Sequence, residues 1–272
     1  MVELLKEQYH YVRTLFPIQE EYIEPKAVVD LNNPGWVFAD SPTQPKAALI
    51  WVQGNNGFYL LGTYNVQCVE ELNRVVDMIL IPRIISKGIK WFEFSGVSPV
   101  TDTDLKRIFK SRKLSSWQQT IYQYKETDFT TCVTPQKGQL CEIKDIGVKY
   151  PVENTEFVNN MILKNWESIE VFQEKANGYC FLIDNIVASI AITGWIAGNI
   201  HEISIETVDS HRRRGYAKIC ASALINCYIQ QGYTPHWECE TANTASAKLA
   251  EGFGFTKLSD YMCYGFKIGE PH

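Results

Sequence analysis

The sequence predicts an α/β (α+β) protein made of two halves with the same layout. The first reason is that apolar segments typical of strands alternate with segments of helical spacing along most of the chain. The second reason is that the order β-β-α-β-α-β of the first half recurs in the second half with one strand added, on the other side of a stretch with clustered Thr, Pro and Gly at 127–139. We therefore expect an N-terminal domain over residues 1–130 and a C-terminal domain over residues 138–272.

The first half is expected to begin its regular structure with a β-hairpin. Residues 46–65 contain two apolar runs around a Gly/Asn-rich turn, a pattern typical of hairpins. Helical spacing follows over residues 69–88, where Pro82 should kink or interrupt the helix. The rest of this half is predicted as a strand at 89–96, a helix at 101–112 and a strand at 117–126.

The second half is expected to repeat this order. Residues 178–198 predict a hairpin around Asp184-Asn185, because Asp and Asn tolerate the left-handed backbone of tight turns. Residues 214–232 have helical spacing and end on Gly232, a common residue just past a helix. The remaining elements are predicted as strands at 199–208, 234–240 and 256–267 and a short helix at 243–254.

Composition indicates an ordinary globular protein and excludes several classes of partner. Hydrophobic residues make up 45% of the 272 residues, which leaves little room for extended disorder. The net charge of -5 argues against nucleic-acid binding, which needs a basic face. No run has the length of a membrane span or the apolar core of a signal peptide, and the eight cysteines have no C-x-x-C spacing. We expect a cytoplasmic protein with reduced thiols and without membrane or nucleic-acid partners.

A run of three arginines and a glycine lies where a predicted strand gives way to a predicted helix. It reads HRRRGYA over residues 211–217. One interpretation is a solvated helix start that binds nothing. The other is an anion cradle, because the first N–H groups of a helix have no partner within it and carry the positive end of its dipole. Gly215 would then let a phosphate approach the backbone closely, and Arg212, Arg213 and Arg214 would add positive charge.

Two motifs follow successive strands of the second half. Arg212-x-x-Gly215-x-Ala217 comes after the strand EISIET, and Asn243 followed by Gly254-Phe255 comes after the next strand. This arrangement resembles the R/Q-x-x-G-x-G/A motif and the N-x-x-A…G-F segment of the GNAT superfamily of acyl-CoA-dependent N-acyltransferases. The resemblance covers about residues 140–272. By its layout, the two-part chain looks most like the zwittermicin-resistance type of acetyltransferase.

The resemblance implies a fold, a coenzyme and a reaction. The implied fold is GNAT-like, a mixed, mostly antiparallel sheet flanked by helices, with two such halves in tandem. The implied reaction transfers an acetyl group from acetyl-CoA to the primary amine of a small, cationic acceptor without a metal. Main-chain groups of Ile205 and Thr207 would pair with the pantetheine arm. The other implied coenzyme-binding residues are Arg212, Arg213, Arg214, Gly215, Tyr216, Ala217, Asn243 and Ser246.

The first half lacks these motifs, so it is expected to be a degenerate GNAT-like domain. The segment after its hairpin has no Arg/Gln-x-x-Gly, and the helix there is expected to start with acidic residues that would repel pyrophosphate. Aromatic residues of this half would either fill a core or line an acceptor pocket. They are Trp36, Trp51, Tyr59, Tyr64 and Trp91.

Acetyl transfer needs a neutral amine, so a general base near the thioester is expected. His201 is the first candidate because imidazole titrates near neutrality, and the alternative is a histidine hydrogen-bonded within its strand. Glu206 is the second, since it lies near the point where this strand should splay to admit the thioester. Ala250 stands where the superfamily often has a tyrosine that protonates the leaving thiolate. Because two residues compete for the role of base and Ala250 cannot donate a proton, a non-catalytic acyl-CoA-binding or regulatory module is the alternative function.

Overall fold

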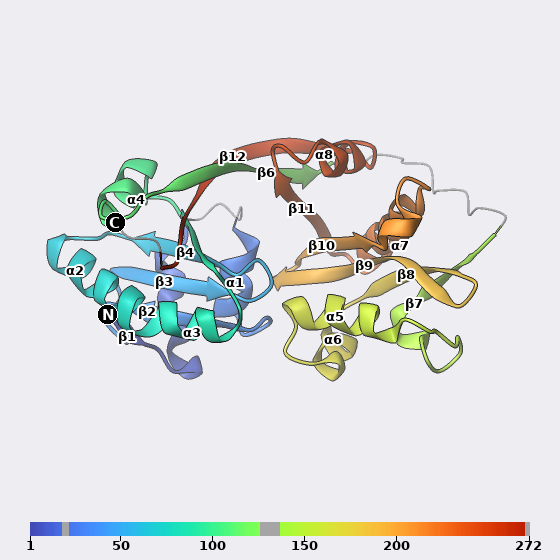
Figure 1. The fold of residues 1–272 in the computed structure, drawn as a ribbon, viewed down its shortest axis with the longest axis horizontal. Helices are drawn as coiled ribbons and strands as arrows, with labels where there is room; N and C mark the ends of the chain where they lie inside the picture. Colours follow the sequence, from blue (N-terminus) through green and yellow to red (C-terminus); the bar gives the residue numbers. More distant parts are fainter. Residues whose placement is uncertain (18–21, 126–136, 270–272) are drawn as a thin grey trace. The chain divides into compact units, whose positions relative to one another are not determined.

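The computed structural model describes residues 1–17, 22–125 and 137–269 (Figure 1). The chain forms two compact units. Unit 1 consists of Met1–Gln119 and Asp260–His272, and unit 2 consists of Thr120–Ser259. Most of the predicted boundary stretch lies outside the described residues, and the functional division into residues 1–130 and 138–272 stays a prediction. Among the described residues, no helix combines the length and the apolar character needed to cross a membrane.

Unit 1 contains a mostly antiparallel sheet. In spatial order its strands are β1 (Val2–Glu3), β2 (Gly35–Ala39), β3 (Ala47–Val52), β4 (Gly57–Gly62), β5 (Trp91–Gly96) and the second part of β12 (Phe255–Lys267). Only β4 and β5 pair in parallel among these neighbours. The hairpin predicted over residues 46–65 is therefore confirmed as β3–β4, while β1 and β2 were not predicted.

The helices of unit 1 from residue 66 onward agree with the local sequence signals, whereas the first two helical segments were not predicted. The helical segments are η1 (Lys6–Leu15), α1 (Ile23–Val29), α2 (Val66–Val75), η2 (Val76–Leu80), α3 (Ile81–Ser86) and α4 (Asp102–Ile108). Pro82 lies in the first turn of α3, directly after the π-helical segment η2, so the predicted interruption is present. The Thr101 hydroxyl caps α4 by accepting a hydrogen bond from the Asp104 N–H at 3.2 Å.

The aromatic residues of unit 1 mostly fill its core. Trp51, Tyr59 and Tyr64 are buried, and Trp36 stacks on Trp51 with ring centroids 3.9 Å apart. Trp91 is 38% exposed. Burial of the first three supports the core interpretation of these side chains over the pocket interpretation.

The strands of unit 2 form a mixed arrangement of parallel and antiparallel pairs. In spatial order its strands are the first part of β12, the second part of β6 (Ser115–Tyr124), β11 (Thr234–Glu240), β10 (Ile200–Thr207), β9 (Ile186–Ala197), β8 (Gly178–Ile183) and β7 (Gln139–Glu142). β7 to β10 are antiparallel, whereas β10 and β11 are parallel. The β8–β9 turn contains Asp184 and Asn185 at φ 47° and 62°, as the hairpin signal predicted.

Helices cover both faces of the unit 2 sheet. They are η3 (Ile143–Asp145), α5 (Thr155–Asn165), α6 (Ile169–Lys175), η4 (Asp209–His211), α7 (Tyr216–Gln230) and α8 (Thr244–Glu251) (Figure 1). Ala191 of β9 packs in a cluster with α7, while its neighbours Ile190 and Ile192 pack with α5 and α6. Since adjacent strand residues point to opposite faces, α7 and the α5–α6 pair lie on opposite sides. The predicted mixed, mostly antiparallel sheet flanked by helices is confirmed.

Candidate active site

The parallel strands β10 and β11 separate part-way along their length. Their register covers Ile200 with Thr234, His201 with Pro235 and Glu202 with His236. β10 continues to Thr207 and β11 to Glu240, with no further paired residues described between them. Beyond Glu202, the main-chain groups of β10 that point away from β9 therefore face a gap on the β11 side, as an added strand-like ligand would need.

A β-bulge lies at the same level. Thr193 of β9 pairs with Ile203 of β10, and Ile196 pairs with His201, so two β9 residues lie opposite Glu202. Bulges increase local twist, bend a strand and re-aim its side chains. The bulge and the strand separation thus coincide at one residue, Glu202.

The turn between β10 and α7 has the geometry of an anion cradle. Arg213 and Gly215 have φ values of 61° and 83°, and Gly215 is the residue before the helix. No side chain caps this helix start. In the described part of the chain, none of the N–H groups of residues 213–217 donates a hydrogen bond. Five main-chain donors at the positive end of α7 are therefore available to a ligand.

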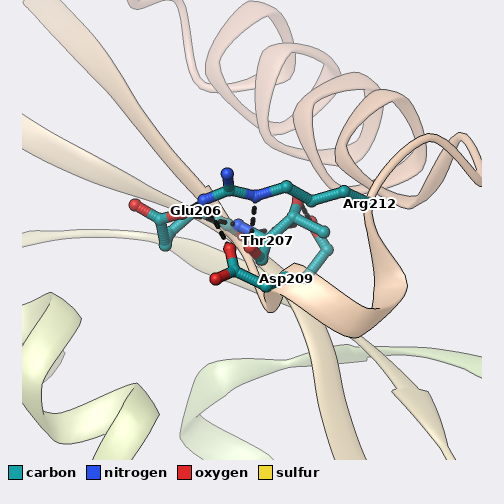
Figure 2. A network of polar contacts seen from close by, with 5 residues as sticks. Glu206, Thr207, Asp209 and Arg212 are labelled. Carbon is teal, nitrogen blue, oxygen red and sulfur yellow. Dashed lines mark hydrogen bonds and ion pairs between the residues drawn. The ribbon is translucent and has the colours of Figure 1, made fainter.

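The side chain of Arg212 folds back over the turn (Figure 2). Its Nε donates to the Thr207 carbonyl oxygen at 3.3 Å, and its Nη2 lies 3.3 Å from Glu206 Oε1 and 2.9 Å from Asp209 Oδ1. Arg212 therefore braces the end of β10 against the start of the turn. Arg214 acts similarly, donating from Nη2 to the Ser210 carbonyl oxygen at 3.1 Å.

Asn243 and Ser246 organise the neighbouring strand-to-helix turn. The Asn243 side chain accepts a hydrogen bond from the Ser246 N–H at 3.1 Å and so caps α8. The Ser246 hydroxyl accepts a hydrogen bond from Trp237 Nε1 at 3.0 Å, which ties α8 to β11. Because β10 and β11 are parallel, the two turns follow the same edge of the sheet.

His201 lies in the core of unit 2. It is 3% exposed, its ring stacks on Tyr233 at 3.9 Å, and it meets Tyr228 edge-on at 5.2 Å. Burial lowers the pKa of His201 from 6.5 to about 4, so its ring is neutral at pH 7. A base with this pKa is a weak proton acceptor for an alkylammonium, although its catalytic role stays a prediction.

Glu206 belongs to the turn. It is partly exposed, and its Oε1 interacts with Arg212 and accepts a hydrogen bond from the Thr207 N–H at 3.2 Å. Its carboxylate is thus engaged in holding the turn together, and its role as a base also stays a prediction.

Glu202 is a functional candidate that sequence reasoning did not select. Its side chain is 5% exposed, and Ser204 Oγ donates to its Oε2 at 3.1 Å. A buried carboxylate at the point of strand separation is a candidate for proton transfer or for binding a cation. The sequence shows that Glu202 and His201 alternate along a strand, but only the strand register shows that Glu202 lies beside His236 at the opening.

Metal ligands and thiols give no alternative site in the described part of the chain. No group of three or more His, Cys, Asp or Glu residues there could hold a metal ion. The seven cysteines in that part are free thiols. Burial raises the pKa of Cys239 on β11, which disfavours the thiolate that an acyl-cysteine route would need.

Comparison with known proteins decides the family. The family described as GNAT acetyltransferase matches residues 13–264. The chain belongs to the GNAT acetyltransferase family. The match spans both halves, and it confirms the resemblance that the second half alone suggested. This GNAT protein is therefore an acyl-transferring enzyme of the N-acetyltransferase type, while the zwittermicin-resistance type stays a prediction.

Relatives of this GNAT protein share its full length. It is 26% identical over 274 residues to the uncharacterized N-acetyltransferase YdfB of Bacillus subtilis (strain 168), covering 96% of this chain and 97% of that protein. A GCN5-related N-acetyltransferase-like protein from Streptococcus suis has a similar structure, with a TM-score of 0.67, 18% identity and coverage of 96% and 99%. A tandem GNAT protein from the clavulanic acid biosynthesis pathway has a TM-score of 0.57, 9% identity and coverage of 98% and 94%. The tandem relative fits the two-half architecture predicted here.

Proposed function

We propose that this protein transfers an acetyl group from acetyl-CoA to the primary amine of a small, cationic acceptor. The observation that carries the proposal is the β10–α7 turn, whose N–H groups at residues 213–217 have no hydrogen-bond acceptor in the described chain. A pyrophosphate is a suitable ligand for such a cluster of donors at a helix N-terminus.

The coenzyme is expected to extend from this turn along the free side of β10. The pyrophosphate would accept hydrogen bonds from main-chain groups of residues 213–217, with charge from Arg212 and Arg214 close by. The pantetheine amides would pair with main-chain groups of Ile205 and Thr207, which follow the last residue pair between β10 and β11. The main-chain groups of Thr207 would exchange their contacts with Glu206 and Arg212 for the coenzyme. Asn243 and Ser246, at the next turn, would border the coenzyme on its other side.

The chemical step is attack of an amine on a thioester. The amine nitrogen bonds to the acetyl carbon, the carbon–sulfur bond breaks, and the amine loses a proton. His201 and Glu206 remain candidates for taking this proton, and the buried Glu202 carboxylate is a third. Glu202 is favoured by its position at the strand separation, whereas the Glu206 carboxylate is engaged by Arg212.

The acceptor is expected to carry positive charge. A buried carboxylate at the opening and a net charge of -5 both favour a cation over an anion. These features do not distinguish a polyamine from an aminoglycoside or an amino acid, so the assay must include each class.

The alternative is a non-catalytic acyl-CoA-binding module. It is favoured by Ala250, which is fully buried in α8 and has no proton to give to a leaving thiolate. In this alternative the β10–α7 turn would still bind the coenzyme.

Thiol release from acetyl-CoA separates the two functions. The full-length protein is assayed with polyamines, aminoglycosides and amino acids, while calorimetry measures CoA affinity. Acceptor-dependent thiol release supports the enzyme. CoA binding without turnover on any acceptor would support the module, and absence of CoA binding would overturn both.

A further inference from the structure

Strand β9 contains one glycine, Gly194, although nearly all of its residues are buried. A glycine inside a strand weakens it by roughly 0.5–1 kcal/mol relative to alanine. Backbone conformation does not require glycine here, because Gly194 is not among the residues with positive φ. The absence of a side chain therefore has another cause at this position.

The space beside Gly194 is filled by two side chains of β10. A β-carbon on residue 194 would lie 2.5 Å from Ser204 Oγ and 3.2 Å from the carboxyl carbon of Glu202, and closer still to Glu202 Oε2. The separations from the two oxygen atoms, Ser204 Oγ and Glu202 Oε2, are too short for non-bonded atoms, so an added methyl group would displace the carboxylate.

The Glu202 carboxylate is fixed from a second direction. Ser204 Oγ donates to Glu202 Oε2 at 3.1 Å. The bulge places Gly194 opposite Glu202 at the level where β10 and β11 separate. The room that Gly194 leaves on β9 and the hydrogen bond from Ser204 on β10 thus both act on the position of this carboxylate.

We propose that Gly194 and Ser204 are positioning residues that hold the Glu202 carboxylate where it accepts the proton of the acceptor amine. This inference rests on the proposed acetyl transfer. As the amine nitrogen bonds to the acetyl carbon, its proton passes to Glu202, the carbon–sulfur bond breaks, and the CoA thiolate leaves and takes a proton from solvent. Moving the carboxylate by about 1 Å would lengthen this proton transfer and slow the step.

Two titratable side chains lie next to Glu202. His236 is its register partner on β11, and the Tyr228 hydroxyl of α7 donates to the Glu202 carbonyl oxygen at 3.4 Å. Burial raises the pKa of Tyr228 well above its usual value, so this phenol stays protonated near neutral pH. Because a pH profile would report on Glu202 and His236 together, the test uses rescue by a shorter acid.

The test compares Gly194→Ala, Glu202→Asp and the double variant in the full-length protein. Aspartate is one methylene shorter and withdraws the carboxylate from the space that alanine fills. We expect Gly194→Ala to lower kcat about 100-fold with KM for acetyl-CoA nearly unchanged. The kcat of the double variant should be at least about tenfold higher than that of Gly194→Ala alone. Ser204→Ala should lower kcat about tenfold, because it removes the hydrogen bond to the Glu202 carboxylate.

Gly252→Ala is the matched control, because its β-carbon would meet nothing closer than the Lys248 carbonyl oxygen at 3.2 Å. It should keep the parent kcat. Parent-like kcat in Gly194→Ala, or a double variant no faster than Gly194→Ala, would overturn the proposal.

Urea unfolding gives a second readout that does not need activity. Glu202→Asp should restore part of the stability that Gly194→Ala loses, and additive losses would show that the two side chains do not compete for space. If the parent protein acetylates no acceptor, the proposed function fails, while this coupling still tests the packing of Glu202 against Gly194.

Discussion

Two strand-to-helix turns of this protein, β4–α2 in unit 1 and β10–α7 in unit 2, follow the hairpin of their own unit and differ in how the helix start is capped. In unit 1, β4 leads to α2, and the Asn65 side chain caps that helix by accepting a hydrogen bond from the Cys68 N–H at 2.8 Å. In unit 2, β10 leads to α7, and Gly215 leaves the helix start uncapped. A capped helix start has used a donor that an anion would need. The cap chemistry therefore separates a structural turn from a candidate coenzyme turn.

The two parallel strand pairs, β4–β5 in unit 1 and β10–β11 in unit 2, differ in whether the pairing continues to the end of the shared segment. In unit 1, β4 and β5 stay paired from Gly57 with Glu93 to Leu60 with Gly96, and the Val97 N–H also donates to the Leu60 carbonyl oxygen. In unit 2 the pairing of β10 and β11 stops at Glu202. A continuous ladder leaves no main chain for a pantetheine arm, so unit 1 lacks both features. The acidic residues expected at the start of α2 lie outside its first turn, so the Asn65 cap rather than repulsion distinguishes this helix start.

The largest expected effect is at the uncapped turn. Gly215→Glu should weaken CoA binding by roughly 100-fold or more, because it places a carboxylate near a polyanion and strains a residue at φ 83°. Calorimetry measures the affinity, and circular dichroism checks that the fold is kept. Gly232→Glu is the control, since Gly232 has φ 77° and equally open surroundings at the other end of α7. Unchanged CoA affinity in Gly215→Glu would contradict the cradle.

The second effect concerns proton transfer at the separated strands. Glu202→Gln should lower kcat about 10²- to 10⁴-fold, the usual range for loss of a positioned base, with little change in CoA affinity. The same kinetics on His201→Ala and Glu206→Gln rank the three candidates. A loss of this size in His201→Ala with an active Glu202→Gln would return the role to the imidazole.

A third effect is the pH dependence of stability. The folded protein holds the pKa of His201 near 4, below its unfolded value of 6.5, so the unfolded state binds more protons between these values. The His201 contribution should therefore lower stability as pH falls from about 6.5 to 4, by about 3 kcal/mol at the lower end. Urea unfolding of the parent and of His201→Phe, which keeps a ring against Tyr233, measures it. Identical pH profiles for both proteins would refute the buried, neutral imidazole.

The smallest effect tests the capped turn of unit 1. Asn65→Ala should destabilise the protein by about 1 kcal/mol through loss of the α2 cap and leave CoA affinity unchanged. Thermal unfolding and calorimetry on one sample measure both quantities. A changed CoA affinity would mean that the β4–α2 turn contributes to coenzyme binding and is not a purely structural turn.

Local signals predicted much of the fold. The turn at Asp184-Asn185, the interruption near Pro82 and the cap at Thr101 each depend on residues close in sequence, and all three are present. The position of the β10–α7 turn was also predicted, because the arginine run follows an apolar strand. No element was predicted before residue 46, so β1, η1, α1 and β2 were missed.

The candidate site was harder to predict because it depends on register. Nothing in the sequence near Glu202 shows that His236 lies beside it or that Gly194 leaves room for its carboxylate. His201 has the residue type expected of a base, but burial shifts its pKa away from neutrality. Side-chain type predicted His201 and Glu206 as candidates, and the strand pairing adds Glu202 to them.

The division of β12 between the units affects how the protein is made on the ribosome. Residues 263–267 pair with β5 at residues 91–95, inside unit 1. Unit 1 therefore lacks one strand of its sheet until some 170 further residues have been synthesised, and β5 has an exposed edge throughout that interval. A fragment that ends between the halves would therefore lack this strand and keep the edge of β5 open.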